Sequence, residues 1–500
     1  MKNLNFTNRY YKLSDDFYQA QLPCEIKNPY IIHINPLMAK ELDLDISSID
    51  TMEFAQFSSG NSLLENSHPT ASIYAGHQFG HFVPQLGDGR ALLLGEIKNK
   101  ANQYWELQLK GSGKTPFSRS GDGRAVLRST IREYLCSEAM AGLNIPTTRS
   151  LSMVGSEEEV YRETIETGAV MLRLSPSFIR FGSFELFSSR EQYAQVKQLA
   201  DFVIENYYPD ITKQLGAASD INPYKLLLKS NVINTAELIA KWQAVGFNHG
   251  VMNTDNMSII GLTLDYGPFA FLDHFDNKFI CNHSDHQGRY SFENQPFIGF
   301  WNLNCLANAM LSLISVDEAK EVLGLYESSY YGNYYSLMFK KLGLFNTQER
   351  QYEKLVDSLL ELMQSNKVDY SVFFRQLSNF SLSQDRSTLQ SKNKLLIEMF
   401  AEQKDFIDWL EKYMQALVSK NENISSSLRK SKMDKINPKY ILRNYIAQTV
   451  IEKVELDKDY NFFDQWLKIL QSPFDEHPEM ESFSGVAPEW AKTISISCSS

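Results

Sequence analysis

Two carboxylates and one amide stand close together within residues 246–267. Asp255 and Asn256 are adjacent, and Asp265 follows nine residues after Asn256. Apolar residues on both sides of Gly261 predict a strand, a turn and a strand, a hairpin that would bring Asn256 and Asp265 to the same end. Their side-chain oxygens suit Mg²⁺ or Mn²⁺, hard ions that keep part of their coordination shell for substrate phosphates. The alternative is a surface hairpin whose Asn and Asp residues only form turns.

Glycines and basic residues lie upstream in positions that suit phosphate binding. The tetrapeptide Gly-Asp-Gly-Arg at 87–90 stands in a predicted loop before a strand, and Lys110 ends the next predicted strand. Gly87 and Gly89 would let backbone amides approach phosphate oxygens, and Arg90 would add charge-assisted hydrogen bonds. The alternative is an ordinary tight turn, because the sequence contains neither a complete dinucleotide-binding fingerprint nor a P-loop.

A helix is predicted at 125–142, directly after a second Gly-Asp-Gly-Arg-Ala at 121–125. Asp122 is expected to cap its start and Gly142 to end it. Its predicted buried stripe consists of Leu127, Ile131, Leu135, Ala139 and Leu143. Glu133 lies off this stripe, and a strand-end Lys followed by a helical Glu is the arrangement that orients a lysine toward phosphate in kinases. The alternative is a solvated surface glutamate.

Further strands and helices complete the predicted order. Strands are predicted at 147–154, 159–164 and 168–174, helices at about 190–206 and 224–247, and a mostly helical pattern from about 300 onward. Arg173 lies on the last of these strands, and Arg180 follows in a loop. Two arginines near a strand end can bind phosphates through paired hydrogen bonds, although a single Arg in a strand more often lies on an exposed face.

Composition excludes several classes of protein. The chain has 500 residues, 43% of them hydrophobic, and a net charge of −11, which indicates a packed globular protein without the basic surface of a nucleic-acid carrier. No apolar run is long enough for a membrane span, and the N-terminus has no secretory pattern, so a cytoplasmic location is expected. The five cysteines are too few and too widely spaced for a disulfide framework.

Two groups of metal-ligating residue types are weighed as zinc sites. Cys281, His283, Asp285 and His286 fall within six residues, but ligands so close together rarely converge on one ion, and no second half-site follows. His77 and His81 could pair on a helix, but the surrounding glycines predict a loop. Both groups are expected to be structural or to contact substrate.

The order of elements is kinase-like, from a glycine-rich loop through a strand-end Lys and a helical Glu to a helical lobe with a metal site. His249 and Gly250 align with a phosphotransferase catalytic loop, but Val251 stands where that loop carries its base. Asp255 is the only carboxylate close enough to replace the missing base.

Longer segments resemble the selenoprotein O family of kinase-like pseudokinases. They are YAGHQFGHFVPQLGDGRALLLGE (74–96), LQLKGSGKTPFSRSGDGRAVLRSTIREYL (107–135), FNHGVMNTDNMSI (247–259), LDYGPFAFLD (264–273), NPKYILRNYIAQ (437–448) and the terminal SCSS. The resemblance extends over essentially the whole chain. It implies an α+β, protein-kinase-like fold of two lobes, with a β-rich N-lobe that carries a helix, a mainly helical C-lobe, and N- and C-terminal extensions.

The resemblance also implies a division of the chain. Residues 1–74 would form an N-terminal extension, 75–188 the N-lobe, 189–480 the C-lobe with the catalytic loop, and 481–500 a tail that contains Cys498. Because chain ends are mobile, Cys498 could reach Cys281 and form a regulatory disulfide, although two unrelated thiols are as good an interpretation.

The activity implied by the resemblance is transfer of AMP from ATP to Ser, Thr or Tyr hydroxyls of proteins. Asp255 would be the base, Asn256 and Asp265 would hold Mg²⁺ or Mn²⁺, and Glu133 would pair with Lys110. The residues implied to bind nucleotide are Gly87, Gly89, Arg90, Lys110, Asp122, Gly123, Arg173 and Arg180. UTP is an alternative nucleotide. Alternative functions are a kinase-like phosphotransferase and an inactive nucleotide-binding scaffold; no nucleic-acid or membrane partner is expected.

Overall fold

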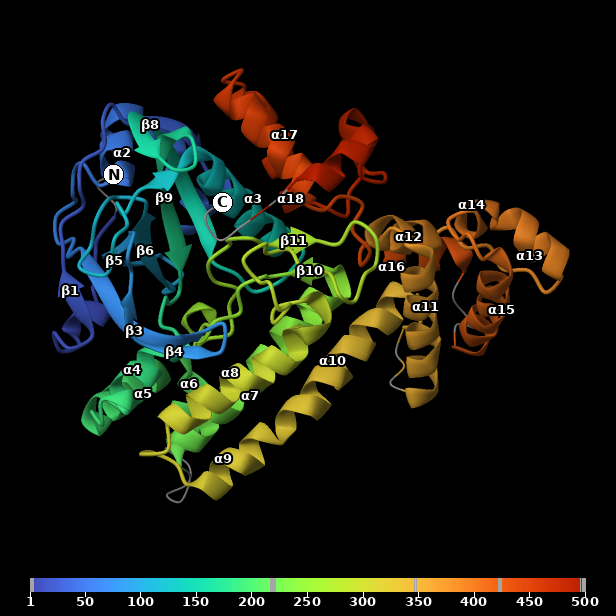
Figure 1. Cartoon of the computed structure of the whole chain (residues 1–500), viewed down its shortest axis with the longest axis horizontal. Coiled ribbons are helices and arrows are strands. Elements are labelled where there is room, and N and C mark those ends of the chain that lie inside the picture. The colour runs from blue at the N-terminus through green and yellow to red at the C-terminus, as the bar shows by residue number, and fades with distance from the viewer. Residues whose placement is uncertain are drawn as a thin grey trace.

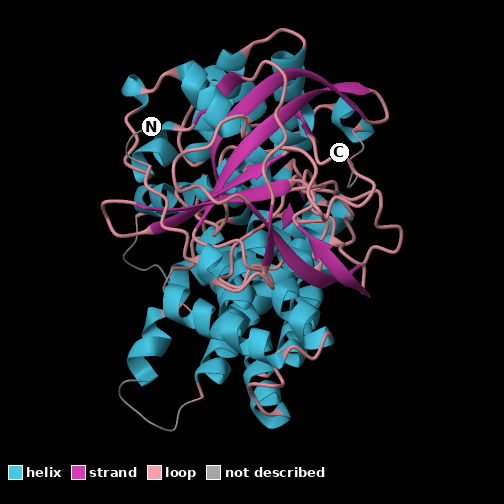
Figure 2. Cartoon of the chain, turned by 90° about the vertical axis from the view of Figure 1, so that its left-hand side faces the viewer, coloured by secondary structure: helices cyan, strands magenta, loops and turns pink. Residues whose placement is uncertain are grey.

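The computed structural model describes residues 4–215, 222–345, 347, 349–420, 425–494 and 496. The fold is α+β and has two lobes, as predicted. Figure 1 shows a twisted sheet with helix α3 at the upper left and the long helices α7, α8 and α10 below it. In the side view of Figure 2, strands occupy the upper half of the molecule and helices most of the lower half.

Antiparallel strands build the sheet of the upper lobe. Within the described residues they are β1 (Tyr18–Ala20), β2 (Tyr30–Ile34), β3 (Thr70–Gln78), β4 (His81–Gly87), β5 (Ala91–Lys98), β6 (Tyr104–Lys110), β7 (Ala125–Val126), β8 (Arg149–Tyr161) and β9 (Ile165–Ser175). Their order is β1-β3-β5-β6-β9-β8-β2, with β4 paired to β3 and β7 to β9. A separate short pair consists of β10 (Phe247–Asn248) and β11 (Ala270–Phe271).

Helices follow and flank the sheet. In the described chain they are α1 (Pro36–Glu41), α2 (Thr51–Ser59), α3 (Leu127–Gly142), α4 (Phe181–Ser189), α5 (Tyr193–Tyr207), α6 (Pro209–Leu215), α7 (Pro223–Val245), α8 (Gln295–Ala309), α9 (Val316–Leu323), α10 (Leu325–Lys341), α11 (Glu353–Asn366), α12 (Tyr370–Leu377), α13 (Arg386–Lys392), α14 (Lys394–Ile397), α15 (Gln403–Lys420), α16 (Ser426–Asp434), α17 (Asn444–Glu455) and α18 (Tyr460–Gln471).

The central strands β6 and β9 are buried on both faces, and their period-two alternation separates apolar from polar side chains. Leu107 and Leu109 of β6 enter the core that also contains Phe54 and Phe57 of α2. The intervening Gln108 points the other way and pairs in register with Arg173 of β9. This alternation places Lys110, two residues after Gln108, on the same polar face as Arg173.

Helix α3 crosses that polar face, and its predicted apolar stripe is buried as expected. Its outer side packs against α17 and α18, which Figure 1 shows above it in red. The approach is close at Gly142, where a Cβ atom would lie 2.0 Å from the carbonyl oxygen of Leu470. Helices from the far end of the chain therefore cover the helix that carries Glu133.

Residues 1–74 contribute strands to the main sheet. β1, β2, α1 and α2 all come from residues 1–74, and the two strands lie at opposite ends of the main sheet. The division of the chain at residues 74, 188 and 480 stays a prediction.

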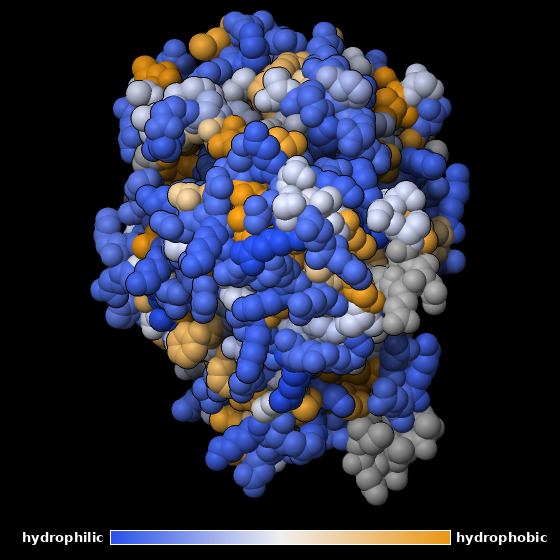
Figure 3. All heavy atoms as spheres, turned by 90° about the vertical axis from the view of Figure 1, so that its right-hand side faces the viewer, coloured by the Kyte–Doolittle hydropathy of each residue, from blue (hydrophilic) through white to orange (hydrophobic). Residues whose placement is uncertain are grey.

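No helix in the described ranges is both long and apolar enough to cross a membrane. Figure 3 shows a mainly hydrophilic face with scattered hydrophobic residues.

The predicted bounds of three elements were wrong. The segment 257–264 is not a two-stranded hairpin but a turn held by a single bridge between Met257 and Thr263. The helix predicted from Ala125 begins at Leu127 with Val126 at the N-cap position, because Ala125 and Val126 pair with β9 instead. The predicted strands 147–154 and 159–164 are one continuous strand, β8, which a register shift between Gly155 and Glu159 accommodates.

Candidate functional site

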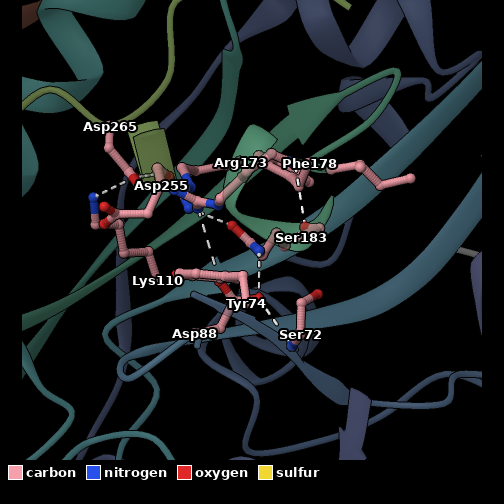
Figure 4. Close-up of polar contacts among 12 residues, drawn as sticks. Ser72, Tyr74, Asp88, Lys110, Arg173, Phe178, Ser183, Asp255 and Asp265 are labelled. Atoms are coloured by element: carbon pink, nitrogen blue, oxygen red, sulfur yellow. Dashed lines mark hydrogen bonds and ion pairs between the residues drawn. The ribbon is translucent and has the colours of Figure 1, made fainter. Parts of the chain in front are cut away.

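A cleft of about 820 Å³ lies between the sheet, α3 and the segment 251–268. All twelve residues predicted to form the site line it: Gly87, Gly89, Arg90, Lys110, Asp122, Gly123, Glu133, Arg173, Arg180, Asp255, Asn256 and Asp265. Figure 4 shows Lys110, Arg173 and Asp265 converging at one end, with Tyr74 and Asp88 deeper in the sheet.

Asp265 is the centre of the charged cluster. Its Oδ1 lies 3.1 Å from the Lys110 ammonium and 2.5 Å from the Arg173 guanidinium, and its Oδ2 lies 2.7 Å from Arg180. Burial opposes ionisation of this carboxyl, but the three cations outweigh it and hold the pKa of Asp265 well below its usual range. The backbone of Asp265 is left-handed, with φ 54°, a conformation that Asp and Asn adopt more readily than most residues.

Glu133 completes the cluster from helix α3. One carboxylate oxygen lies 2.5 Å from Lys110 and the other 2.8 Å from Arg173. Because Glu133 is buried, the interpretation of a solvated surface glutamate is wrong. Burial lowers the pKa of Lys110, although Asp265 and Glu133 counteract it. The pair that strand and helix spacing predicted is present, and Arg173 shares it.

Asp255 lies beside this cluster and differs from it electrostatically. Its side chain is buried, and Gln78 donates a hydrogen bond to Oδ2 at 3.1 Å. Its other oxygen, Oδ1, is buried with no hydrogen-bond partner within the described structure. Desolvation raises the pKa of Asp255 to about 6, and Arg180 limits the rise. A carboxyl of this kind is suited to accept a proton near neutral pH.

His249 connects the segment of Asp255 to that of Asp265. Its Nε2 faces the carbonyl oxygen of Leu264 at 2.9 Å, and its Nδ1 faces the N–H of Val251 at 3.4 Å. These partners assign the tautomer, because Nε2 must donate and Nδ1 must accept. Burial lowers the pKa of His249, so the ring is neutral, and its two hydrogen bonds join the two segments.

The two glycine-rich segments pack against each other at the open side of the cleft. Thr115 Oγ1 donates to the Asp88 carbonyl at 2.7 Å, and Ser118 donates to the Gly89 carbonyl. Gly123 has φ 70°, and a Cβ there would lie 2.1 Å from the Gly113 carbonyl oxygen, so only glycine fits.

Two of the predicted site residues in these segments, Arg90 and Asp122, lie at the surface. Arg90 is exposed at the rim of the cleft. The prediction that Asp122 caps α3 was wrong; Asp122 binds Arg162 at 2.7 Å and accepts the N–H of Arg124 at 2.9 Å.

The implied divalent metal fits the residues present. Asn256 donates its Nδ2 to the Val251 carbonyl at 3.0 Å, which leaves its amide oxygen available. A carboxylate has about four lone-pair positions, and the three cations on Asp265 occupy three, which leaves one on Oδ2. With the unpartnered Oδ1 of Asp255 nearby, the donors are all oxygen, the set that Mg²⁺ and Mn²⁺ prefer.

Sequence reasoning missed two polar residues of the site, the half-buried Gln78 and the buried Asp88. Gln78 holds Asp255 from strand β3. Asp88 accepts the N–H of Ser72 at 3.1 Å and the hydroxyl of Tyr74 at 3.2 Å, so it anchors the first glycine-rich loop. The flanking glycines predicted a role for the backbone around Asp88. No local sequence pattern predicted that the Asp88 side chain is buried.

The segment 281–286 behaves as a structural loop. Asp285 accepts the N–H groups of Arg289 and Tyr290 at 3.0 and 2.7 Å. In the described part of the chain, its Cys, His and Asp side chains do not bring three ligand atoms within 4.8 Å of one another. The N–H of His283 donates to the carbonyl of the buried Ile496 at 3.0 Å. Cys498 lies outside the described residues, so its bond with Cys281 stays a prediction.

Comparison with known proteins adds three findings. A family model described as "Protein adenylyltransferase SelO" matches residues 1–471. The chain is similar to proteins named protein nucleotidyltransferase YdiU, at 46% identity for that of Thiobacillus denitrificans and 47% for that of Pseudomonas fluorescens strain Pf0-1. Each comparison extends over 100% of this chain and 99% of the relative.

Proposed function

Because this chain belongs to the protein adenylyltransferase SelO family, we propose that its cleft transfers AMP from ATP to Ser, Thr or Tyr hydroxyls of proteins. The chain is a protein nucleotidyltransferase, and the proposal concerns how its own residues perform the reaction. The observation that carries it is the placement of Asp255, a buried carboxyl with a pKa of about 6, beside a cluster of three cations.

The reaction is a displacement at the α-phosphorus. Asp255 accepts the proton of the acceptor hydroxyl, whose oxygen forms a bond to the α-phosphorus. The bond between that phosphorus and the bridging oxygen breaks, and pyrophosphate leaves with the electron pair. General-base assistance contributes typically ~10²–10⁴-fold to such a step. Val251, at the position where a phosphotransferase carries its base, supports Asp255 in this role.

The leaving pyrophosphate needs concentrated positive charge. Lys110, Arg173 and Arg180 supply it from the floor of the cleft, and the exposed Arg90 extends it to the rim. Glu133 keeps Lys110 and Arg173 in place through its two ion pairs. Fixed charges that face the developing anion stabilise the transition state without reorganising.

Gly87 and Gly89 offer backbone amides to the phosphates, and Gly123 preserves the close packing of the second loop. We propose that Asp122, at the cleft rim, contacts the nucleoside end of the substrate. Asn256 and Asp265 would hold Mg²⁺ or Mn²⁺, which would neutralise phosphate charge when bound.

The first experiment distinguishes transfer of AMP from transfer of phosphate. The protein is incubated with α-labelled and, separately, γ-labelled ATP in the presence of Mg²⁺ or Mn²⁺. We expect the α-label alone to become protein-bound, and Asp255→Asn to abolish it, while the surface variant Asp317→Asn retains it. Stable γ-label on hydroxyl side chains would instead establish a phosphotransferase.

The same assay examines the remaining alternatives. Absence of both labels from protein, with nucleotide still bound, would indicate an inactive scaffold. Replacement of ATP by α-labelled UTP measures transfer of UMP. The cytoplasmic location predicted from the sequence is tested by fractionation of the cells that produce the protein.

A further inference from the structure

A histidine, a glutamate and a cysteine meet below the active cleft, where β3, α4 and α8 pack together. His77 is the penultimate residue of β3, Glu185 lies in α4 and Cys305 in α8. One ligand atom from each lies within 4.8 Å of the other two. Figure 1 shows α4 and α8 directly below the β3–β4 hairpin, so secondary structure supplies all three side chains.

Glu185 is the unusual member of this group. Its side chain is 5% exposed, and Oε1 lies 2.5 Å from His77 Nδ1. Its second oxygen, Oε2, is buried and has no hydrogen-bond partner in the described structure. Leaving one oxygen of a buried carboxylate unsatisfied destabilises the folded state. A cation within the group would remove that destabilisation.

The chemistry of the three side chains indicates which cation. Imidazole nitrogen, thiolate sulfur and carboxylate oxygen together are the ligands of Zn²⁺ and similar transition ions, whereas Mg²⁺ and Ca²⁺ select oxygen alone. We propose that His77, Glu185 and Cys305 form a Zn²⁺-class metal site, separate from the Mg²⁺ or Mn²⁺ site of Asn256 and Asp265. Three protein ligands leave a fourth position for water.

Cys305 is half-buried. Burial raises the pKa of its thiol to about 12, and the neighbouring Glu185 adds to the rise. Such a thiol is a poor nucleophile, which argues against a Cys–His–Glu catalytic triad. Metal binding would displace the thiol proton to solvent and neutralise the charge of Glu185 at the same time.

The proposed site has direct connections to the cleft. The N–H of His77 donates to Thr254 Oγ1 at 2.7 Å, and the next residue, Gln78, holds Asp255. Glu185 lies in α4, the helix that begins directly after Arg180. A metal that fixes β3 to α4 would therefore hold Gln78 and Arg180 in their positions around Asp255 and Asp265. In this role His77, Glu185 and Cys305 are positioning residues.

The test begins with the wild-type protein as purified. We expect about one zinc per chain by elemental analysis after exposure to Zn²⁺ and removal of the excess. Replacement by Co²⁺ should give the sulfur-to-metal charge-transfer absorption of a cobalt thiolate and intense visible bands of four-coordinate geometry. Zn²⁺ should also raise the melting temperature, because it binds only the folded state.

Variants assign the ligands. Cys305→Ser should lose the charge-transfer band, and Glu185→Gln, which keeps the size of the side chain, should weaken Co²⁺ binding by on the order of 10–100-fold or more. Cys24→Ser and His81→Ala replace an exposed cysteine and an exposed histidine and should behave like the wild type. None of these measurements depends on AMP transfer, so the metal site and the proposed reaction are tested independently of each other.

Three results would overturn the proposal. They are wild-type protein that binds no more zinc than Cys305→Ser, a Co²⁺ spectrum without a thiolate band, and a band that survives in Cys305→Ser. Any of them would show that the three residues form no metal site, only a hydrogen bond between His77 and Glu185 next to an unrelated thiol. If Cys305→Ser does not fold, the wild-type spectrum and the Glu185→Gln affinity decide.

Discussion

One guanidinium nitrogen of Arg180 binds both the side chain of Asp265 and the backbone carbonyl of Asp255. Its Nη1 lies 2.7 Å from Asp265 Oδ2 and 2.6 Å from the backbone carbonyl oxygen of Asp255. One buried side chain thus fixes the distance between the residue proposed to hold the metal and the residue proposed to accept the proton.

Arg180→Ala should lower nucleotide affinity about 10–100-fold, because hydrogen bonds to charged groups contribute about 1.5–3 kcal/mol each. Arg180→Lys should recover part of this affinity, since lysine keeps the charge but lacks the fixed planar geometry of the guanidinium. Calorimetric titration with a non-hydrolysable ATP analogue measures the effect. The surface variant Arg386→Ala should bind like the wild type, and equal affinity in Arg180→Ala would exclude the proposed role.

Asp255→Asn should be inactive and yet more stable than the wild type at neutral pH. The pKa of Asp255 is about 6 in the folded protein and near 3.8 when unperturbed, so ionisation above pH 6 costs folded-state stability. The variant avoids this cost, which is on the order of 3 kcal/mol. The gain in melting temperature should be full at pH 7.5 and should shrink as the pH falls toward 4, where the wild-type carboxyl is protonated.

The same pKa predicts how activity depends on pH. The proposed base must be ionised, so kcat/KM should rise with pH through about 6, because that ratio reports ionisation in the free enzyme. A rate that does not change between pH 5 and pH 7, in folded protein, would contradict the assignment of Asp255 as base.

Mn²⁺ should bind weakly to the free protein and tightly with nucleotide. Lys110, Arg173 and Arg180 surround Asp265 and repel a further cation until phosphates supply negative charge. We expect at least roughly a tenfold gain in Mn²⁺ affinity with an ATP analogue, and by linkage the same gain in nucleotide affinity with Mn²⁺. Asp265→Asn, which tolerates the left-handed backbone, should abolish both gains. Equal Mn²⁺ affinity with and without nucleotide would contradict this.

Gly142→Ala should destabilise the protein by about 1–3 kcal/mol, because a Cβ at 2.0 Å from the Leu470 carbonyl must push α3 and α18 apart. Gly332 in α10 is the matched control, since a Cβ there meets nothing within 4 Å. Gly332→Ala should therefore stabilise the protein by about 0.5–1 kcal/mol. Thermal unfolding compares the two, and a Gly142→Ala melting temperature at or above that of the wild type would show that α3 and α18 are not tightly coupled.

The sequence predicted the pair of Lys110 and Glu133, because a strand-end lysine followed by a glutamate on the next helix is a known local arrangement. That Lys110 and Arg173 share a face follows from strand alternation and register, which the structure shows. Asp265 and Asn256 were expected to meet in a hairpin; a turn with one bridge stands in its place, and both residues line the same cleft.

The remaining features depend on tertiary contacts, which the local periodicity of residue types along the sequence does not predict. Gln78 reaches Asp255 across 177 residues of sequence, and His77 reaches Glu185 across 108. The glycines around His77 predicted a loop, but it lies in β3, where sheet pairing outweighs glycine's conformational freedom. The contacts of Asp122 with Arg162 likewise replaced a cap that its position favoured.

The packing of α17 and α18 on α3 has a consequence for the synthesis of the protein. A nascent chain that has left the ribosome as far as α16 already contains every residue of the cleft, but it lacks the two helices that press on α3 and so on Glu133. Because synthesis proceeds from the N-terminus, the contacts of α17 and α18 with α3 form only after both helices have emerged.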